Sequence, residues 1–159
     1  MVNSMRYKKV IFCSSDCTYR APVAAEIFKR SMAKLGLAGQ IDVVAKGVLV
    51  MFPEPVNGKA IAIGKSRGYD LSECRASAIG NHDFSSSTVV LTMTEFNKFK
   101  IYDLFVNAIN VYTVKEFLGA AGDIEIPFGK NLSAYGESFM QLEELIEQVA
   151  VKIKEMNEN

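Results

Sequence analysis

The sequence contains no tryptophan, one histidine, three cysteines and four prolines among its 159 residues. No apolar run reaches the roughly 18 residues that a membrane-spanning helix needs, and residues 1–9 lack the apolar stretch of a secretory signal. With 49% hydrophobic and 23% charged residues, the composition is typical of a soluble globular protein and excludes a disordered or collagen-like chain. We therefore expect one domain over residues 1–159, located in the cytoplasm.

An excess of charge of one sign is also missing, because 18 Lys and Arg are balanced by 18 Asp and Glu. This balance gives no support to nucleic-acid or membrane-surface binding, and we expect neither partner. The distribution is nevertheless uneven: residues 1–35 carry seven basic and two acidic side chains (7 − 2 = +5), whereas residues 136–159 carry two and six (2 − 6 = −4). An anion site is therefore expected near the N-terminus.

The scarcity of cysteine and histidine argues against two further classes of protein. Cys13, Cys17 and Cys74 form an odd set without paired C-x-x-C spacing, which a disulfide framework or a zinc site would show. The single histidine, His82, lies in a polar Gly-Asn-His-Asp turn and is assigned no role. We expect reduced thiols, no metal and no cofactor.

Short β-rich runs alternate with amphipathic runs along the chain. Strands are predicted at Lys9–Cys13, Ile41–Ala45, Thr88–Met93 and Ile109–Tyr112, and helices at Pro22–Leu35, Asn57–Arg67, Glu95–Phe105 and Ser138–Lys154. This alternation predicts an α/β fold of three layers, a four-stranded parallel sheet with helices on both faces. The stretch Val114–Tyr135 is predicted to be irregular, because its glycines and proline disfavour a regular element.

Ligands of parallel α/β sheets bind beyond the carboxyl ends of the strands. The first strand is followed there by Ser14-Ser15-Asp16-Cys17-Thr18-Tyr19-Arg20, which leads into the first helix. The backbone N–H groups of such a loop and the helix N-terminus form a concave site for a phosphate, to which an arginine adds a bidentate clamp. Because the helix dipole disfavours an unpaired cation there, we assign Arg20 to an anion or an acidic partner.

Residues 10–24 resemble the loop of low-molecular-weight protein tyrosine phosphatases, which reads Cys-x-Gly-Asn-x-Cys-Arg-Ser-Pro after a first strand. The strand, Arg20, Pro22 and Ala24 match without gaps. Further similar segments extend over most of the chain: Gly47, Gly68–Ser72, Val89–Met93, Lys115–Phe117 and Gly122–Gly129. The resemblance implies this family's fold. It also implies hydrolysis of phosphoproteins through a phosphocysteine without a metal, with an Asp of the long loop as general acid.

The sequence departs from the family at both positions that carry this chemistry. Ser14 stands where the family has its nucleophilic cysteine, and a serine hydroxyl stays protonated at neutral pH. Ile126 stands at the position of the general acid and cannot donate a proton, which leaves Asp123 and Glu125 as the nearest substitutes. We therefore predict an inactive or very slow phosphatase-like protein that keeps an anion-binding loop over residues 14–20.

Three other positions also differ: Asp16, Cys17 and Ala21 replace the family's glycine, its asparagine and the serine that follows its arginine. An inward Asp16 either opposes a phosphate dianion, by roughly 4 kcal/mol at about 4 Å and an effective dielectric near 20, or pairs with Arg20 as an internal anion. An outward Asp16 leaves the remaining N–H groups free for phosphate or sulfate. Both orientations fit the sequence.

Two functions fit these departures. The first, which we favour, is a natural relative with lost or changed chemistry that binds phosphorylated or acidic ligands, or another protein, through the ancestral cleft. The second is an active phosphatase for phosphotyrosine or phosphoarginine whose cysteine was replaced by Ser14 as a substrate trap. A trap explains Ser14 alone. A shifted register with Cys13 as nucleophile would misplace Pro22 and is rejected.

Other side chains have both a functional and a structural interpretation. Three tyrosines fit either the lining of a phosphotyrosine cleft or half-buried packing positions: Tyr19, Tyr112 and Tyr135. Cys13 is interpreted as a core residue and Cys17 as a tolerated replacement rather than a reactive thiol. A disulfide relay through Cys74 is not expected without a cysteine at position 14. The segment 51–53 (Met-Phe-Pro) offers exposed apolar side chains to a partner.

Overall fold

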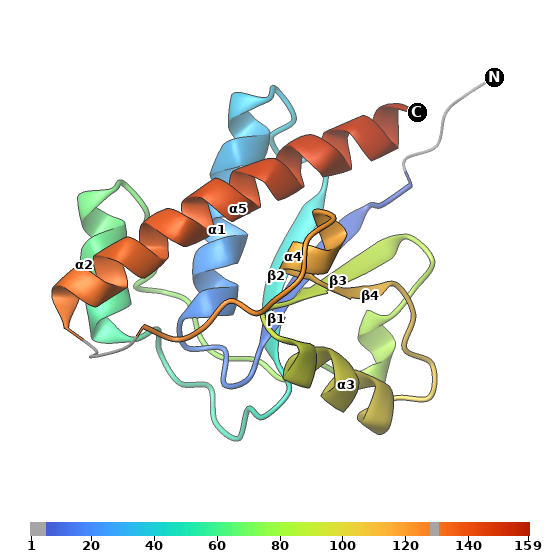
Figure 1. Ribbon diagram of the computed structural model, residues 1–159, viewed down its shortest axis with the longest axis horizontal. Helices are drawn as coiled ribbons and strands as arrows, with labels where there is room; N and C mark the ends of the chain where they lie inside the picture. The colour runs from blue at the N-terminus through green and yellow to red at the C-terminus, as the bar shows by residue number, and fades with distance from the viewer. Residues whose placement is uncertain (1–5, 128–130) are drawn as a thin grey trace.

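The computed structural model describes residues 6–127 and 131–159 (Figure 1). Its centre is a parallel sheet in the order β2-β1-β3-β4, formed by β1 (Lys9–Ser14), β2 (Asp42–Gly47), β3 (Thr88–Thr92) and β4 (Val111–Thr113). The register pairs Ser14 with Gly47, and Thr92 with both Cys13 and Thr113. The carboxyl ends of the four strands therefore lie together at one end of the sheet.

Helices cover both faces of this sheet (Figure 1). On one side lie α1 (Arg20–Lys34) and α5 (Leu132–Glu158), with α2 (Gly58–Ser66) and α4 (Val114–Phe117) in contact with α5. On the other side α3 (Glu95–Leu104) packs along β3 and β4, and a short 3-10 helix, η1 (Asn81–Asp83), precedes β3. The arrangement confirms the predicted three-layer α/β fold.

The strand β1 shows why both faces must be covered. Its side chains alternate between two separate cores: Val10 and Phe12 join the larger core with α1 and α5, while Ile11 and Cys13 join a smaller one with Ile101 of α3. These four side chains are all fully buried. A central parallel strand that is apolar on both faces stabilises the fold only between two helical layers.

The stretch Val114–Tyr135 contains more regular structure than predicted. Its first turn is α4, where Thr113 and Glu116 form a capping box. The helix α5 begins at Leu132, six residues before the predicted start (138 − 132 = 6), and continues to Glu158. Four residues are too few to display a helical period, and Gly136, a poor helix former, interrupts the pattern in α5. Residues 118–127 form neither helix nor strand, and residues 128–130 lie outside the described residues.

The beginning and end of the described chain lie side by side (Figure 1). The backbone N–H of Tyr7 donates to Asn157 Oδ1 (2.9 Å), and Asn157 Nδ2 donates to Tyr7 O (3.0 Å).

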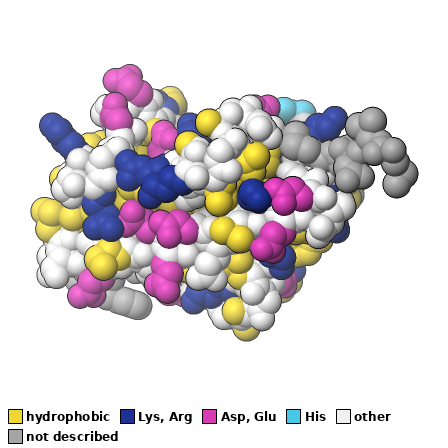
Figure 2. Space-filling model, turned by 90° about the horizontal axis from the view of Figure 1, so that it is seen from above, with side chains coloured by type: hydrophobic (Ala, Val, Ile, Leu, Met, Phe, Trp, Pro, Cys, Tyr) yellow, Lys and Arg dark blue, Asp and Glu magenta, His cyan; other side chains and the backbone are white. Residues whose placement is uncertain are grey.

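Basic and acidic side chains are interleaved on the face shown in Figure 2. Among the described residues, no helix is long and apolar enough to cross a membrane.

Candidate anion-binding site

The loop between β1 and α1 is held by its two neighbouring elements. The segment after β2 contributes the backbone N–H of Leu49, which donates to Ser15 O (2.9 Å). From α3, the fully buried Asn97 donates through Nδ2 to Ser15 Oγ (3.0 Å). The loop is therefore fixed in place at the carboxyl end of the central strand, where ligands of this fold class bind.

Ser14 lies at the base of the loop, with 1% of its surface exposed. Its Oγ has no hydrogen-bond partner among the residues that the structure describes. Leaving a buried hydroxyl unpaired costs about 1–3 kcal/mol, and such groups are rare enough in folded proteins to require an explanation. Ser14 thus presents an unused hydrogen-bonding group at the predicted nucleophile position.

The first turn of α1 also has unused donors. Its N-cap residue, Tyr19, makes no side-chain cap, and the turn contains no acidic residue. The first N–H groups of any helix lack intrahelical partners, and at α1 no side chain in the described part of the protein supplies a substitute. The positive end of the α1 dipole therefore faces the loop without a neutralising group.

Gly47, the last residue of β2, permits the close approach of the loop. A Cβ atom at this position would lie 2.6 Å from the backbone O of Ser15 and 3.1 Å from Cys17 Cβ. Cys17 itself has φ +62°, the left-handed conformation in which asparagine and glycine are less strained than cysteine. The loop therefore keeps a tight path even though cysteine replaces the asparagine that suits it.

The thiol of Cys17 points into the protein, where it is 2% exposed. Burial raises its pKa, although a hydrogen bond from the Ser77 backbone and the charge of Lys46 act in the opposite direction. Lys46 Nζ donates to Ser77 Oγ (2.9 Å), so the cation is itself engaged. This geometry favours the interpretation of Cys17 as a tolerated, protonated replacement.

Arg20 connects the loop to the segment after α4. The side chain is 5% exposed, and Nη1 donates to the backbone O of Ile124 (2.8 Å). Burial lowers the pKa of the guanidinium group, while the nearby carboxylates of Asp16, Glu125 and Asp123 oppose this shift. The remaining N–H groups of the guanidinium make no hydrogen bond to another described residue that would compete with a bound anion.

Asp16 adopts the outward orientation. The residue is exposed, and its Oδ1 accepts a hydrogen bond from the backbone N–H of Thr18 (3.2 Å). Within the described ranges no carboxylate lies within 4.0 Å of the Arg20 guanidinium. Asp16 is therefore not an ion-pair partner of Arg20, but it does occupy one N–H donor of the loop.

The two carboxylates nearest the predicted acid position differ in their surroundings. Asp123 Oδ1 accepts a hydrogen bond from the backbone N–H of Glu95 (2.8 Å) at the start of α3. Glu125 is exposed, and so is Ile126, at 48%. Asp123 is thus occupied by a capping interaction, whereas Glu125 lies in solvent on the other side of Ile124.

Comparison with known proteins identifies the family. Residues 9–159 match the family described as low molecular weight phosphotyrosine protein phosphatase. The chain belongs to this family. The matched residues include β1, the loop and Arg20.

Three similar proteins illustrate the range of the family. The protein-arginine-phosphatase of Bacillus subtilis is 31% identical over 150 residues, covering 91% of this chain and 96% of that protein. The low molecular weight protein-tyrosine-phosphatase PtpB of Staphylococcus epidermidis is 24% identical over 144 residues, covering 91% and 98%. A solved structure of a cysteine-to-serine mutant of YwlE arginine phosphatase, with a phosphorylated active-site serine, has a TM-score of 0.84 at 29% identity, covering 92% and 95%.

Two of the tyrosines singled out in the sequence are buried in this phosphatase-family protein. Tyr19 and Tyr135 are both 5% exposed, and their rings pack edge to face with centroids 5.1 Å apart. Tyr19 also donates through its hydroxyl to Ser138 Oγ (2.7 Å). These two tyrosines are packing residues that join the loop to α5, which favours the packing interpretation over the cleft lining for both.

The remaining candidates are dispersed. Cys13 is a core residue, as predicted, and burial raises the pKa of its thiol and also that of Cys74. The imidazole of His82 is 77% exposed and 3.7 Å from Asp83. Met51 (85%) and Phe52 (65%) are exposed, as expected. No group of three metal-ligating side chains is found within residues 6–127 and 131–159.

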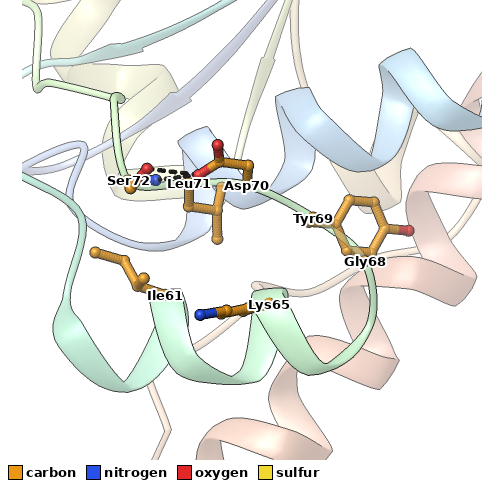
Figure 3. A pocket seen from close by; sticks show the side chains of 7 residues that line it. All are labelled: Ile61, Lys65, Gly68, Tyr69, Asp70, Leu71 and Ser72. Atoms are coloured by element: carbon orange, nitrogen blue, oxygen red, sulfur yellow. Dashed lines mark hydrogen bonds between the residues drawn. The ribbon is translucent and has the colours of Figure 1, made fainter.

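A separate pocket of about 540 Å³ lies between α2 and the segment 68–72 (Figure 3). Lys65 and Ile61 approach it from the helix, and Asp70 lies across from them (Figure 3). Asp70 Oδ1 already accepts hydrogen bonds from the N–H (3.0 Å) and the hydroxyl (2.6 Å) of Ser72. No residue of the loop 14–20 lines this pocket, so it is distinct from the candidate anion site.

Sequence reasoning missed Asn97, the buried residue that contacts the loop. It follows the N-cap Thr94 by three positions and donates its backbone N–H to Thr94 Oγ1 (3.1 Å). An Asn at this place in a helix is an ordinary first-turn residue, so the local pattern gives no signal of a long-range contact. Only the packing of α3 along β3 and β4, which brings Asn97 to Ser15, reveals it.

Proposed function

We propose that this family member binds the phosphoryl group of a phosphorylated protein, or a free phosphate or sulfate, in the loop 14–20 and hydrolyses phosphomonoesters slowly or not at all. The observation that carries this proposal is Ser14, whose buried hydroxyl at the predicted nucleophile position has no hydrogen-bond partner within residues 6–127 and 131–159. The alternative is an active phosphatase whose nucleophile was replaced by Ser14, and the two are separated by restoring the cysteine.

Binding is supported by the donors that converge on the loop. The uncapped N-terminus of α1 supplies backbone N–H groups and the positive end of a helix dipole. Arg20 is anchored through one nitrogen on Ile124 O, which leaves its other N–H groups to clamp an oxyanion. Together these features provide a site for a tetrahedral anion without a metal or cofactor.

Impaired turnover is supported by the residues found at the nucleophile and general-acid positions in the described part of the chain. A serine hydroxyl needs a neighbouring base to attack phosphorus, and His82 projects into solvent from η1. Ile126 cannot protonate a leaving group, Asp123 caps α3, and Glu125 is exposed. General acid catalysis typically contributes about 10²–10⁴-fold, so its loss alone makes hydrolysis slow.

The serine mutant of the YwlE arginine phosphatase indicates what Ser14 does with a substrate. Its active-site serine is phosphorylated, so a serine hydroxyl in that relative accepts a phosphoryl group. By the same step Ser14 Oγ would form a bond to phosphorus as the leaving group departs with the hydroxyl proton. Since an alkoxide is a poorer leaving group than a thiolate, the phosphoserine would persist. This favours binding or single transfer over repeated turnover.

We further propose a reducing compartment such as the cytoplasm, because the three cysteines are unpaired and at least half-buried. A phosphorylated protein is the proposed partner. The exposed Met51 and Phe52 follow β2, whose next residues contact the loop, and offer such a partner an apolar contact.

Calorimetric titration with inorganic phosphate tests the binding site. Removing a charge-assisted clamp costs about 1.5–3 kcal/mol, so Arg20→Ala is expected to weaken binding by about 10- to 150-fold. Arg20→Lys keeps the charge and retains part of the affinity, which separates loss of the clamp from loss of the fold. Arg75→Ala, which removes an exposed arginine outside the loop, is the control. Unchanged affinity in Arg20→Ala overturns the site.

A further inference from the structure

We propose that the outer face of α3 and the segment after it bind a second copy of this chain, in a dimer with two-fold symmetry. Five apolar side chains define this surface, which we call the α3 face: Phe96, Phe99, Leu104, Val106 and Ile109. The inference goes beyond the proposed function and does not rest on it, because no residue of the loop 14–20 belongs to this surface.

The α3 face is apolar where a surface helix ordinarily has polar residues. The opposite side of the helix packs along the sheet and includes Asn97 and Ile101, which are fully buried. On the outer side Phe96 is 57% and Phe99 is 61% exposed, and the three aliphatic side chains of the face range from 45% to 108%. A contiguous apolar surface of this kind marks an interaction site.

The area of the α3 face matches the requirement of a dimer. A specific interface buries about 800 Å² on each partner, of which about 57% is apolar, so roughly 450 Å² of apolar surface is needed. Phe96 and Phe99, each about 60% exposed, supply roughly 180–300 Å², because an aromatic side chain offers about 150–250 Å². The aliphatic side chains add roughly 120–240 Å². A second copy brings the same area.

Two charged residues of α3 lie on the same face as these apolar side chains. Lys100 and Asp103 follow Phe96 by four and seven positions, which is the spacing of neighbours on one side of a helix. Within residues 6–127 and 131–159, no oppositely charged group lies within 4.0 Å of either one. Lys98, by contrast, is paired with Glu116 (2.8 Å). Lys100 and Asp103 are therefore available to a partner.

The order of these residues along α3 is self-complementary. A two-fold axis perpendicular to the helix makes the two copies of α3 antiparallel, and each contact then occurs twice. With the axis between positions 101 and 102, Lys100 faces the partner's Asp103, and Phe99 faces the partner's Leu104, since 100 + 103 and 99 + 104 both equal 203. Phe96 meets the partner's segment after α3. One register thus pairs both charges and covers the apolar side chains.

The charges also exclude the simplest alternative register. An axis through Phe99 would stack the two phenylalanines on each other, but it places Glu95 opposite the partner's Asp103 and Lys98 opposite the partner's Lys100. Like charges that face each other across an interface oppose association. The pairing of Lys100 with the partner's Asp103 is therefore the register that we propose.

Sedimentation equilibrium of the full chain over a range of concentrations tests the inference. The variants are Phe99→Ala, Lys100→Glu, Asp103→Lys and the double variant with both charges exchanged. Met140→Ala is the matched control, because Met140 is a large apolar residue of α5 with 57% exposure, close to the 61% of Phe99. Circular dichroism during urea unfolding checks that each variant is folded.

For the unaltered chain we expect a reversible dimer with a Kd on the order of 10 µM. Phe99→Ala removes apolar contacts at two symmetry-related places and should weaken dimerisation by more than about tenfold. Lys100→Glu and Asp103→Lys each bring like charges together, and each should weaken it by about tenfold. The double variant restores opposite charges, so its Kd should return to within about threefold of the original value. Met140→Ala should leave the Kd unchanged.

A monomer at every concentration overturns the inference. So does a dimer that Phe99→Ala leaves unchanged, because its subunits then meet through another surface. A double variant that dimerises as weakly as the two single variants also overturns it, because the α3 face then does not pair with a copy of itself in this register. Phosphate titration of the same proteins tests the proposed function separately, and its failure does not alter the result on dimerisation.

Discussion

The contact between β2 and the loop predicts that Gly47→Ala both destabilises the protein and disrupts the anion site. The new Cβ would lie 2.6 Å from Ser15 O and 2.6 Å from Val50 Cγ2, far inside a normal contact distance. The glycine cannot move aside easily, because its N–H donates to Ser77 O (2.9 Å) and its carbonyl accepts from Ile79 N–H (3.0 Å). The strain therefore has to displace the backbone of the loop.

Overpacking of this kind costs about 1–3 kcal/mol. For a chain of this size, each kcal/mol lowers Tm by about 2–4 °C, so we expect a decrease of roughly 2–12 °C. Urea unfolding followed by circular dichroism gives the free energy, and phosphate titration below Tm gives the affinity. We expect affinity to fall by more than tenfold, because the N–H groups of a displaced loop no longer converge.

Gly58→Ala is the matched control. Gly58 is the first residue of α2, and a Cβ there would meet no atom within 4 Å. Since alanine favours a helix over glycine by up to about 1 kcal/mol, this variant should be as stable as the chain or more so, with unchanged phosphate affinity. If Gly47→Ala matched Gly58→Ala in both measurements, the argument that β2 sets the path of the loop would be refuted.

Two further predictions follow from buried titratable groups. Burial raises the pKa of Tyr19 to about 12 from an ordinary value of 10. As pH rises, the unfolded chain therefore loses the phenolic proton of Tyr19 before the folded protein does. The contribution of Tyr19 to stability is complete below pH 10 and is lost as pH rises toward 12. Urea unfolding at a series of alkaline pH values should show this loss, and Tyr19→Phe should make the dependence shallower; identical slopes would count against it. Burial also raises the pKa of the Cys13 and Cys17 thiols, so iodoacetamide should modify both slowly in the folded protein and rapidly in urea, as read by mass spectrometry. Rapid labelling of folded Cys17 would contradict its placement.

Much of the architecture could be predicted from the sequence, because the strands are short β-rich runs and the helices α1 and α5 carry a clear helical period. The alternation of strand and helix predicts the parallel sheet, and the loop between Cys13 and Pro22 is found at the expected strand end. α4 escaped prediction, since one turn carries no period. The start of α5 at Leu132 was not predicted, because Gly136 weakens the helical pattern there.

The candidate site was less predictable where it depends on contacts between distant segments. The sequence left the orientation of Asp16 open, and only the structure shows its bond to Thr18 and its separation from Arg20. Likewise, the bond from Arg20 to Ile124 O joins residues 104 positions apart. The burial of Tyr135 against Tyr19 arises from the packing of α5, which no local pattern in either segment encodes.

The central claim is that the loop is intact and that Ser14 and Ile126 limit the chemistry. Hydrolysis of p-nitrophenyl phosphate by the chain and by Ser14→Cys tests it most directly, because p-nitrophenolate leaves without a general acid and so isolates the nucleophile. We expect no turnover above the uncatalysed rate for the chain, and measurable turnover for Ser14→Cys that is lost again when Arg20→Ala is added. Turnover by the chain as fast as that of Ser14→Cys would contradict the claim of impairment, and no turnover by Ser14→Cys would contradict the claim of an intact loop.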